Sequence, residues 1–210
     1  MSESVSSKCR AVLAAVLPYG KEGWWSGDLE EVMIGAVLTQ QTRWENVERG
    51  LVRMKEAGVA YMAGIARCEN GTLEEAIRCT GFYRVKARRL RALACHVLQR
   101  PRGLEGMAAE STVLLQEELL GIAGVGEETA ACILCYGFGR MVFVMDAYTQ
   151  RICGCAGIHV RKDTLHDHIT QELQESAACY RMAHAGFVEY GRRFCHSRRC
   201  PECRVRRSNA

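Results

Sequence analysis

The sequence is poor in proline and aromatic residues and contains no long apolar run. Its 210 residues include 3 prolines and 20 glycines, which excludes collagen-like and low-complexity chains. No apolar stretch approaches the ~20 residues that span a bilayer. The seven apolar residues at 11–17 follow a short basic segment, but no small-residue cleavage site comes after them, so we expect an amphipathic helix there. These absences predict a soluble, cytoplasmic protein with no membrane partner.

The 12 cysteines do not predict a disulfide scaffold. Most of them lie singly in apolar helical patterns, as Cys132 and Cys135 do. Buried single cysteines of this kind are typical of a reducing compartment.

Positive charge is concentrated in two segments. Residues 84–102 hold seven basic residues and no acid, and residues 192–207 hold seven arginines against Glu202 alone. These segments carry +7 and +6, so with a net charge of +4 the rest of the chain sums to −9. Such segregation indicates a polyanionic partner, with solvated helix faces as the alternative.

Helical patterns follow one another along the chain and predict an all-α protein. Thr72 and Glu75 have the spacing of a capping box, and only residues 141–145 resemble a strand. Asp28 is placed to cap a buried helix, and the basic side chains of 84–102 flank an apolar stripe. The expected helices are 28–40, one from 72, 85–97, 107–120, 127–138, 146–155, 164–175 and 179–190.

A glycine-rich turn between two helices is the first functional pattern. Gly121, Gly124, Val125, Gly126 and Thr129 lie between an apolar helix and the next helix start. Glycine permits positive φ and lets a phosphate approach backbone N–H groups at a helix N-terminus. The pattern predicts a hairpin that grips a nucleic-acid backbone, with a simple αα-hairpin as the alternative.

These residues resemble a known family. The segment 122–130, followed by Val144-Met145-Asp146, resembles the hairpin and aspartate of the endonuclease III superfamily (HhH-GPD) of DNA glycosylases, and the segments 35–42 and 81–90 extend the resemblance. It implies a two-lobed, all-α helix-hairpin-helix fold, with a central lobe at 22–138, a second lobe at 1–21 plus 139–210, and DNA in the cleft. The implied function is base excision repair by a monomer that binds double-stranded DNA containing a damaged base.

Asp146 has the chemistry of a glycosylase acid. Cleavage of an N-glycosidic bond builds positive charge on the deoxyribose, so a fixed carboxylate stabilises the transition state and can orient a water. Read locally, Asp146 is also an ordinary helix N-cap. Its spacing from the hairpin favours the catalytic role.

Glu128 departs from the bifunctional members of the family. The resemblance implies a lysine at this position, which attacks the sugar and leads to strand cleavage. A carboxylate cannot form an imine, so we expect AP lyase activity to be absent or weak. Lys86 and Lys162 are candidate substitutes without positional support.

The three tryptophans indicate a base pocket. Trp24, Trp25 and Trp44 flank the buried helix at 28–40, and electron-deficient alkylated purines stack well on indoles. The paired tryptophans and the Gly-Phe-Tyr-x-x-Lys-Ala block are similar to the 3-methyladenine DNA glycosylases. That resemblance implies that Trp25 and Trp44 sandwich the base, with Gln40 near the vacated stack, whereas the alternative is a buried aromatic cluster.

The tail contains Cys195, Cys200 and Cys203, where most of this superfamily bind a [4Fe-4S] cluster through four cysteines. Thiolates two residues apart suit iron–sulfur or zinc. The first spacing is shorter than the family's and no fourth cysteine follows. A remnant, a fourth ligand such as His196 or Cys179, and a tail that binds no metal all remain open.

The sequence therefore favours a monofunctional DNA glycosylase that removes an alkylated purine such as 3-methyladenine. The alternatives are an endonuclease III-like glycosylase and AP lyase that acts on oxidised pyrimidines, and a non-catalytic DNA-binding module.

Overall fold

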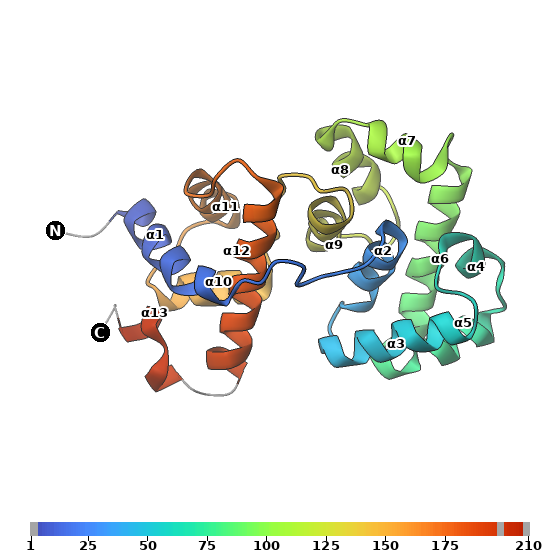
Figure 1. Ribbon diagram of the computed structural model, residues 1–210, viewed down its shortest axis with the longest axis horizontal. Helices are drawn as coiled ribbons and strands as arrows, with labels where there is room; N and C mark the ends of the chain where they lie inside the picture. The colour runs from blue at the N-terminus through green and yellow to red at the C-terminus, as the bar shows by residue number, and fades with distance from the viewer. Residues whose placement is uncertain (1–3, 197–199, 208–210) are drawn as a thin grey trace. The chain divides into compact units, whose positions relative to one another are not determined.

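The computed structural model describes residues 4–196 and 200–207, and all regular structure in these ranges is helical. The expectation of an all-α fold is confirmed. The chain divides into two compact units, one formed by Met1–Trp24 with Gly139–Ala210 and the other by Trp25–Phe138. Figure 1 shows that the first unit combines N-terminal and C-terminal helices. In the part of the chain that the structure describes, no helix has the length and apolar character that crossing a bilayer requires.

The central unit is built around a buried helix, α2. Asp28 accepts a hydrogen bond from the backbone N–H of Glu31, so the expected N-cap is confirmed. Seven of the ten residues of α2 are buried, and α3, α6 and α9 pack around it. The elements of this unit are α2 (Leu29–Leu38), α3 (Trp44–Glu56), α4 (Met62–Arg67), α5 (Asn70–Ala76), η2 (Arg78–Thr80), α6 (Tyr83–Gln99), α7 (Gly103–Ala109), α8 (Thr112–Leu120), α9 (Glu127–Cys132) and η3 (Ile133–Gly137).

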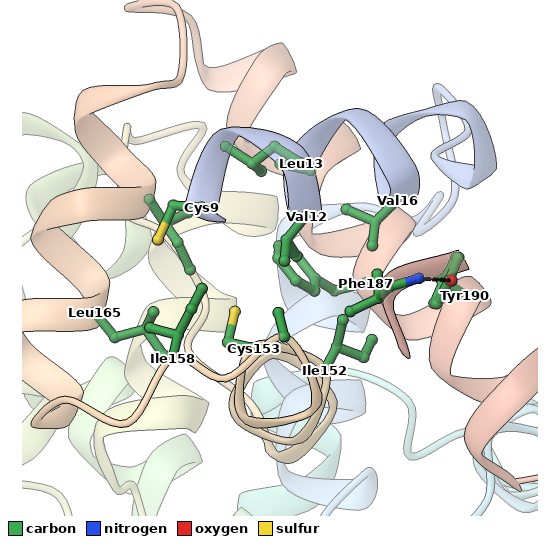
Figure 2. Packing of buried hydrophobic residues seen from close by; sticks show 14 of the residues in the cluster. Cys9, Val12, Leu13, Val16, Ile152, Cys153, Ile158, Leu165, Phe187 and Tyr190 are labelled. Carbon is green, nitrogen blue, oxygen red and sulfur yellow. Dashed lines mark hydrogen bonds between the residues drawn. The ribbon is translucent and has the colours of Figure 1, made fainter. Parts of the chain in front are cut away.

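The other unit packs its helices around one apolar core. Its elements are α1 (Val5–Val16), η1 (Leu17–Tyr19), α10 (Ala147–Cys155), α11 (Lys162–Gln171), α12 (Ala177–Tyr190), η4 (Gly191–His196), η5 (Cys200–Glu202) and α13 (Arg204–Arg207). In Figure 2, Val12 and Val16 of α1 lie close to Ile152 of α10 and Phe187 of α12. Burial raises the pKa of the Cys9 thiol to about 11, which is typical of a structural, unreactive cysteine.

Three local expectations differ from the structure. Helix α5 begins at Asn70 with Glu69 as its N-cap, so Thr72 lies inside the helix and the capping box is wrong. Two residues inside a helix can have the same spacing as a capping box, and Thr72 and Glu75 are such a pair. The Glu75 carboxylate forms an ion pair with Arg78 at 2.9 Å. The helix expected at 127–138 changes to a π-helix at Ile133–Gly137. Residues 141–145 are not a regular strand.

Candidate active site

Asp146 is the N-cap of α10 and is held by two hydrogen bonds. Its Oδ1 accepts from the backbone N–H of Thr149 and from the Thr149 hydroxyl, each at 2.7 Å. The backbone of Asp146 is extended, with φ −92° and ψ 179°, as an N-cap requires. Only 6% of the residue is exposed. The local interpretation as an N-cap is confirmed, and the same bonds fix the carboxylate in place.

His184 of α12 faces the other oxygen of this carboxylate. Its Nε2 lies 3.8 Å from Oδ2 of Asp146, and the residue is 4% exposed. Burial lowers the pKa of the imidazole, and the nearby Asp146 offsets part of that shift. Burial therefore favours the neutral form of His184.

The glycine-rich turn joins α8 to α9. Gly121 is the C-cap of α8, Gly124 has φ +90° and Gly126 is the N-cap of α9. Val125 is buried and its N–H donates to the carbonyl of Ile122 at 3.0 Å, which closes the turn. The turn leads directly into the N-terminus of α9, where the glycine pattern predicts contact with a phosphate.

Gln40 and Arg89 hold this turn through side-chain hydrogen bonds. The Gln40 side-chain amide donates to the Gly124 carbonyl at 3.1 Å and to the Thr129 hydroxyl at 3.0 Å. Arg89 of α6 donates to the Gln40 side-chain oxygen. Both ends of the Gln40 amide are thus engaged within the protein, so the structure gives this residue a supporting position under the hairpin. Its neighbour Gln41 is exposed and has φ +54°.

We expect Gly124→Ala to weaken binding of undamaged duplex DNA about tenfold. A Cβ at this position would lie 2.2 Å from Cγ of Arg89, and the left-handed φ adds ~1–2 kcal/mol of strain. Displacement of Arg89 would also disturb the Gln40 bonds under the turn. The measurement is fluorescence anisotropy of a labelled duplex, with Gly71→Ala as the control, since its Cβ would meet nothing within 4 Å. Unchanged affinity of Gly124→Ala would contradict a phosphate-gripping hairpin.

The three tryptophans do not form one group. Trp25 and Trp44 contact each other at 5.2 Å between ring centroids with an interplanar angle of 73°, and Tyr136 lies 5.3 Å from Trp25. This edge-to-face contact leaves no parallel slot between Trp25 and Trp44, so a sandwich requires one ring to move. Trp24 belongs to the other unit, where its Nε1 donates to Glu189 at 2.9 Å and its ring packs against His184.

Lys86 is a buried structural lysine rather than an exposed nucleophile. Its Nζ donates to the carbonyls of Leu38 and Thr80 at 2.9 and 2.8 Å, and 1% of the residue is exposed. Burial, with a contribution from the charge of Arg89, lowers the pKa of Lys86 to about 8. The amine is committed to two protein carbonyls and cannot reach a sugar in this arrangement.

The hairpin, the capping aspartate and the aromatic cluster can be compared with known proteins. The model of the HhH-GPD superfamily base excision DNA repair proteins matches residues 34–179. The chain belongs to the HhH-GPD superfamily. One relative is MJ1434 of Methanocaldococcus jannaschii, which is named as a DNA repair glycosylase. Its sequence is 35% identical to this one, and the alignment covers 90% of this chain and 89% of MJ1434. The superfamily expected from the sequence is therefore confirmed, and the chain is a DNA N-glycosylase.

Two solved structures share the fold of this HhH-GPD protein. The 3-methyladenine DNA glycosylase of H. pylori, bound to 1,N6-ethenoadenine, is 28% identical, with a TM-score of 0.78 over 91% of this chain and 98% of that one. An endonuclease III–DNA complex is 20% identical, with a TM-score of 0.77 over 97% of this chain and 94% of that one. The second likeness concerns the fold alone.

Glu128 lies at the position where the resemblance to bifunctional HhH-GPD enzymes implies a lysine. It is exposed in the first turn of α9, beside Glu127. Lys162, the other candidate nucleophile, is the half-exposed first residue of α11. Glu128 supplies no amine at its own position in the hairpin helix.

The tail of this HhH-GPD protein brings its three cysteines into one region of the described structure. Cys203 is buried in the apolar core, and its Sγ lies 3.3 Å from the Tyr190 hydroxyl in a hydrogen bond. Cys195 and Cys200 are partly buried nearby, on η4 and η5. Among the side chains that the structure describes, no three His, Cys, Asp or Glu are grouped to hold a metal ion. Residues 197–199 and the side chain of His196 lie outside the described residues.

Many basic side chains of 84–102 have internal partners. Besides Lys86 and Arg89, Arg91 donates to backbone carbonyls in the last turn and at the C-cap of α4, and Arg100 pairs with Glu118 at 2.7 Å. Arg84 and Arg88 on α6 are exposed. Several basic side chains of residues 84–102 therefore stabilise the fold. The positive charge that this segment exposes is smaller than the charge count indicates. In the second segment, residues 198 and 199 and the side chains of 206 and 207 lie outside the description.

Three residues of interest were not singled out for the site by sequence reasoning. Phe82 is 65% exposed, has φ +46° and lies immediately before the basic helix α6. The signal in the sequence was an aromatic residue between a glycine and a basic helix. Tyr136 joins the tryptophans because η3 packs on α2. His184 comes close to Asp146 only through the packing of α12 on α10, and no sequence pattern pairs residues 38 positions apart.

Proposed function

We propose that this DNA glycosylase is monofunctional and hydrolyses the N-glycosidic bond of a flipped, alkylated purine in double-stranded DNA. The observation that carries the proposal is Asp146, a buried carboxylate that two hydrogen bonds from Thr149 fix in place and that His184 faces at 3.8 Å. A fixed negative charge is what an oxocarbenium-like transition state needs. The exposed Glu128 supports hydrolysis over imine chemistry.

In this mechanism the C1′–N bond breaks as the base departs and positive charge develops on the deoxyribose. The base departs with the electron pair of the C1′–N bond. Asp146 stabilises the charge on the sugar and orients a water, which adds to C1′ and transfers its proton to the Asp146 carboxylate. The hairpin amides hold the DNA backbone. Phe82, an exposed apolar side chain on a left-handed turn, suits a wedge that fills the gap left by the extruded base.

The substrate class rests on the aromatic cluster. Trp25, Trp44 and Tyr136 offer flat, electron-rich surfaces within one unit, and an electron-deficient alkylated purine binds such surfaces well. Gly35 lies against Trp25, where a Cβ would come within 2.8 Å of the indole, so the position of this ring is fixed from behind. The similarity to the H. pylori 3-methyladenine glycosylase favours the same class of base. We propose that Trp44 moves to admit the base beside Trp25.

The test is a panel of duplexes that carry 3-methyladenine, 1,N6-ethenoadenine or an oxidised pyrimidine, each assayed with and without alkali. We expect cleavage of the alkylated-purine duplexes after alkali only, because hydrolysis leaves an intact abasic strand. Phe82→Ala should slow release of the same base, since the vacated stack would lose its apolar filler. Strand breaks before alkali would overturn the monofunctional proposal, and activity confined to oxidised pyrimidines would favour the endonuclease III-like alternative.

The tail has its own test. A [4Fe-4S] cluster stays a prediction from the resemblance, and the buried Cys203 thiol argues against it in this arrangement. We expect anaerobically purified protein to lack the broad visible absorbance of iron–sulfur proteins and to contain no stoichiometric iron or zinc. A cluster-like spectrum that Cys200→Ser abolishes would show that the tail binds metal.

A further inference from the structure

The Asp146 carboxylate is held unevenly by the protein. Oδ1 accepts two hydrogen bonds from Thr149, both at 2.7 Å. Oδ2 has a different neighbour, the His184 ring, with Nε2 at 3.8 Å. This separation is longer than a hydrogen bond, so in the described structure the ring is a polar neighbour of Oδ2 within reach of a small adjustment.

The His184 ring is itself held in place. It is buried on α12, and Trp24 packs edge-on against it at 5.7 Å between ring centroids. Trp24 is anchored in turn by the hydrogen bond from its Nε1 to Glu189, one turn further along α12. The chain therefore positions this ring through one aromatic side chain and one carboxylate, both in the same unit as His184. A buried polar ring held this firmly is well placed to orient a neighbour.

We propose that His184 is a positioning residue that directs Oδ2 of Asp146 toward the sugar through its Nε2–H. The inference rests on the proposed catalytic role of Asp146. A neutral donor stabilises one direction of the carboxylate and leaves its charge intact, whereas a lysine or arginine here would neutralise that charge. As the sugar becomes positive, Oδ2 is then already aimed, and no reorientation adds to the barrier.

The experiment compares three substitutions in the full chain. His184→Gln retains a neutral N–H at nearly the distance of Nε2 from the backbone, His184→Asn places it too near the backbone, and His184→Met removes it at similar volume. We expect His184→Gln to keep base release within about threefold of the wild type. His184→Asn and His184→Met should lower single-turnover release roughly tenfold to 100-fold, with the duplex dissociation constant unchanged.

Controls separate this inference from the proposed function. Thermal unfolding of each variant shows whether it folds. If His184→Met does not fold, the comparison of His184→Gln with His184→Asn, which are equally polar, tests the positioning role. Asp146→Asn is assayed in parallel. If Asp146→Asn releases base normally, the catalytic role of Asp146 is wrong. If Asp146→Asn is inactive while folded His184→Asn and His184→Met match the wild type, or if His184→Gln is as slow as they are, the positioning role alone is overturned.

Discussion

Asp146→Asn should reduce base release by about 10²–10⁴-fold while leaving the fold and the DNA affinity intact. The loss follows from removal of the only charge that the proposed mechanism places beside the developing cation. Asparagine is as good an N-cap as aspartate, so its side-chain oxygen can still accept from the backbone N–H and hydroxyl of Thr149. The measurement is single-turnover release of base from a duplex with 3-methyladenine, alongside anisotropy and thermal unfolding.

Asp28→Asn is the matched control for this substitution. Asp28 is likewise an N-cap aspartate, with its Oδ1 accepting from the N–H of Glu31 at 2.8 Å, but it is exposed and caps α2 in the other unit. We expect Asp28→Asn to release base at the wild-type rate. A rate for Asp146→Asn within about threefold of the wild type would mean that the carboxylate is only a cap, and a wild-type protein that binds damaged duplex without releasing any base would favour a non-catalytic module.

Local patterns were sufficient for the features that depend on neighbouring residues. A helix cap involves a side chain and an N–H three residues away, so Asp28 and Asp146 could be assigned as caps from the sequence. The positive φ of Gly124 follows from the same local logic, since a tight turn between two helices needs a residue without a Cβ.

Features that depend on tertiary direction could not be predicted. Trp24 and Trp25 are adjacent in sequence, yet their rings pack in different units, because the division of the chain falls between them. Gln40 carries a side chain typical of DNA contact, but its amide fits the carbonyl of Gly124. A side chain can point in several directions from its backbone position, and tertiary packing selects one of them.

The charge count of residues 84–102 did not show which basic side chains turn inward, for a related reason. A basic side chain is usually solvated, so a run of them is interpreted as a surface. On α6, however, the helix turns Lys86 toward α2 and η2, where two carbonyls at the ends of those elements need donors. The long, flexible lysine side chain can reach carbonyls that belong to different elements, and no periodicity in the sequence reports that these carbonyls lie together.

Lys86→Met should destabilise the protein by about 1–3 kcal/mol at neutral pH and by more at pH 10. The substitution leaves the carbonyls of Leu38 and Thr80 buried without this donor, at ~1–3 kcal/mol each, and the loss is partly offset because methionine has no charge to desolvate. Each carbonyl precedes a turn with a left-handed residue, Gln41 in one and Phe82 in the other. We therefore expect weaker duplex binding by this variant as well.

The lowered pKa of Lys86 determines how the stability difference between the wild type and Lys86→Met changes with pH. Burial lowers the pKa of Lys86 to about 8 from an ordinary 10.5, so between these values the unfolded chain binds the extra proton and the folded chain does not. Wild-type stability gains from this group as pH rises from 8 to 10.5, and the neutral amine still has two N–H groups for its two carbonyls. The measurement is the difference in urea unfolding free energy between wild type and Lys86→Met at pH 7 and pH 10, with the exposed Lys21→Met as control. A difference that does not grow at pH 10 would mean that the pKa of the Lys86 amine is not lowered in the folded chain, contrary to its burial.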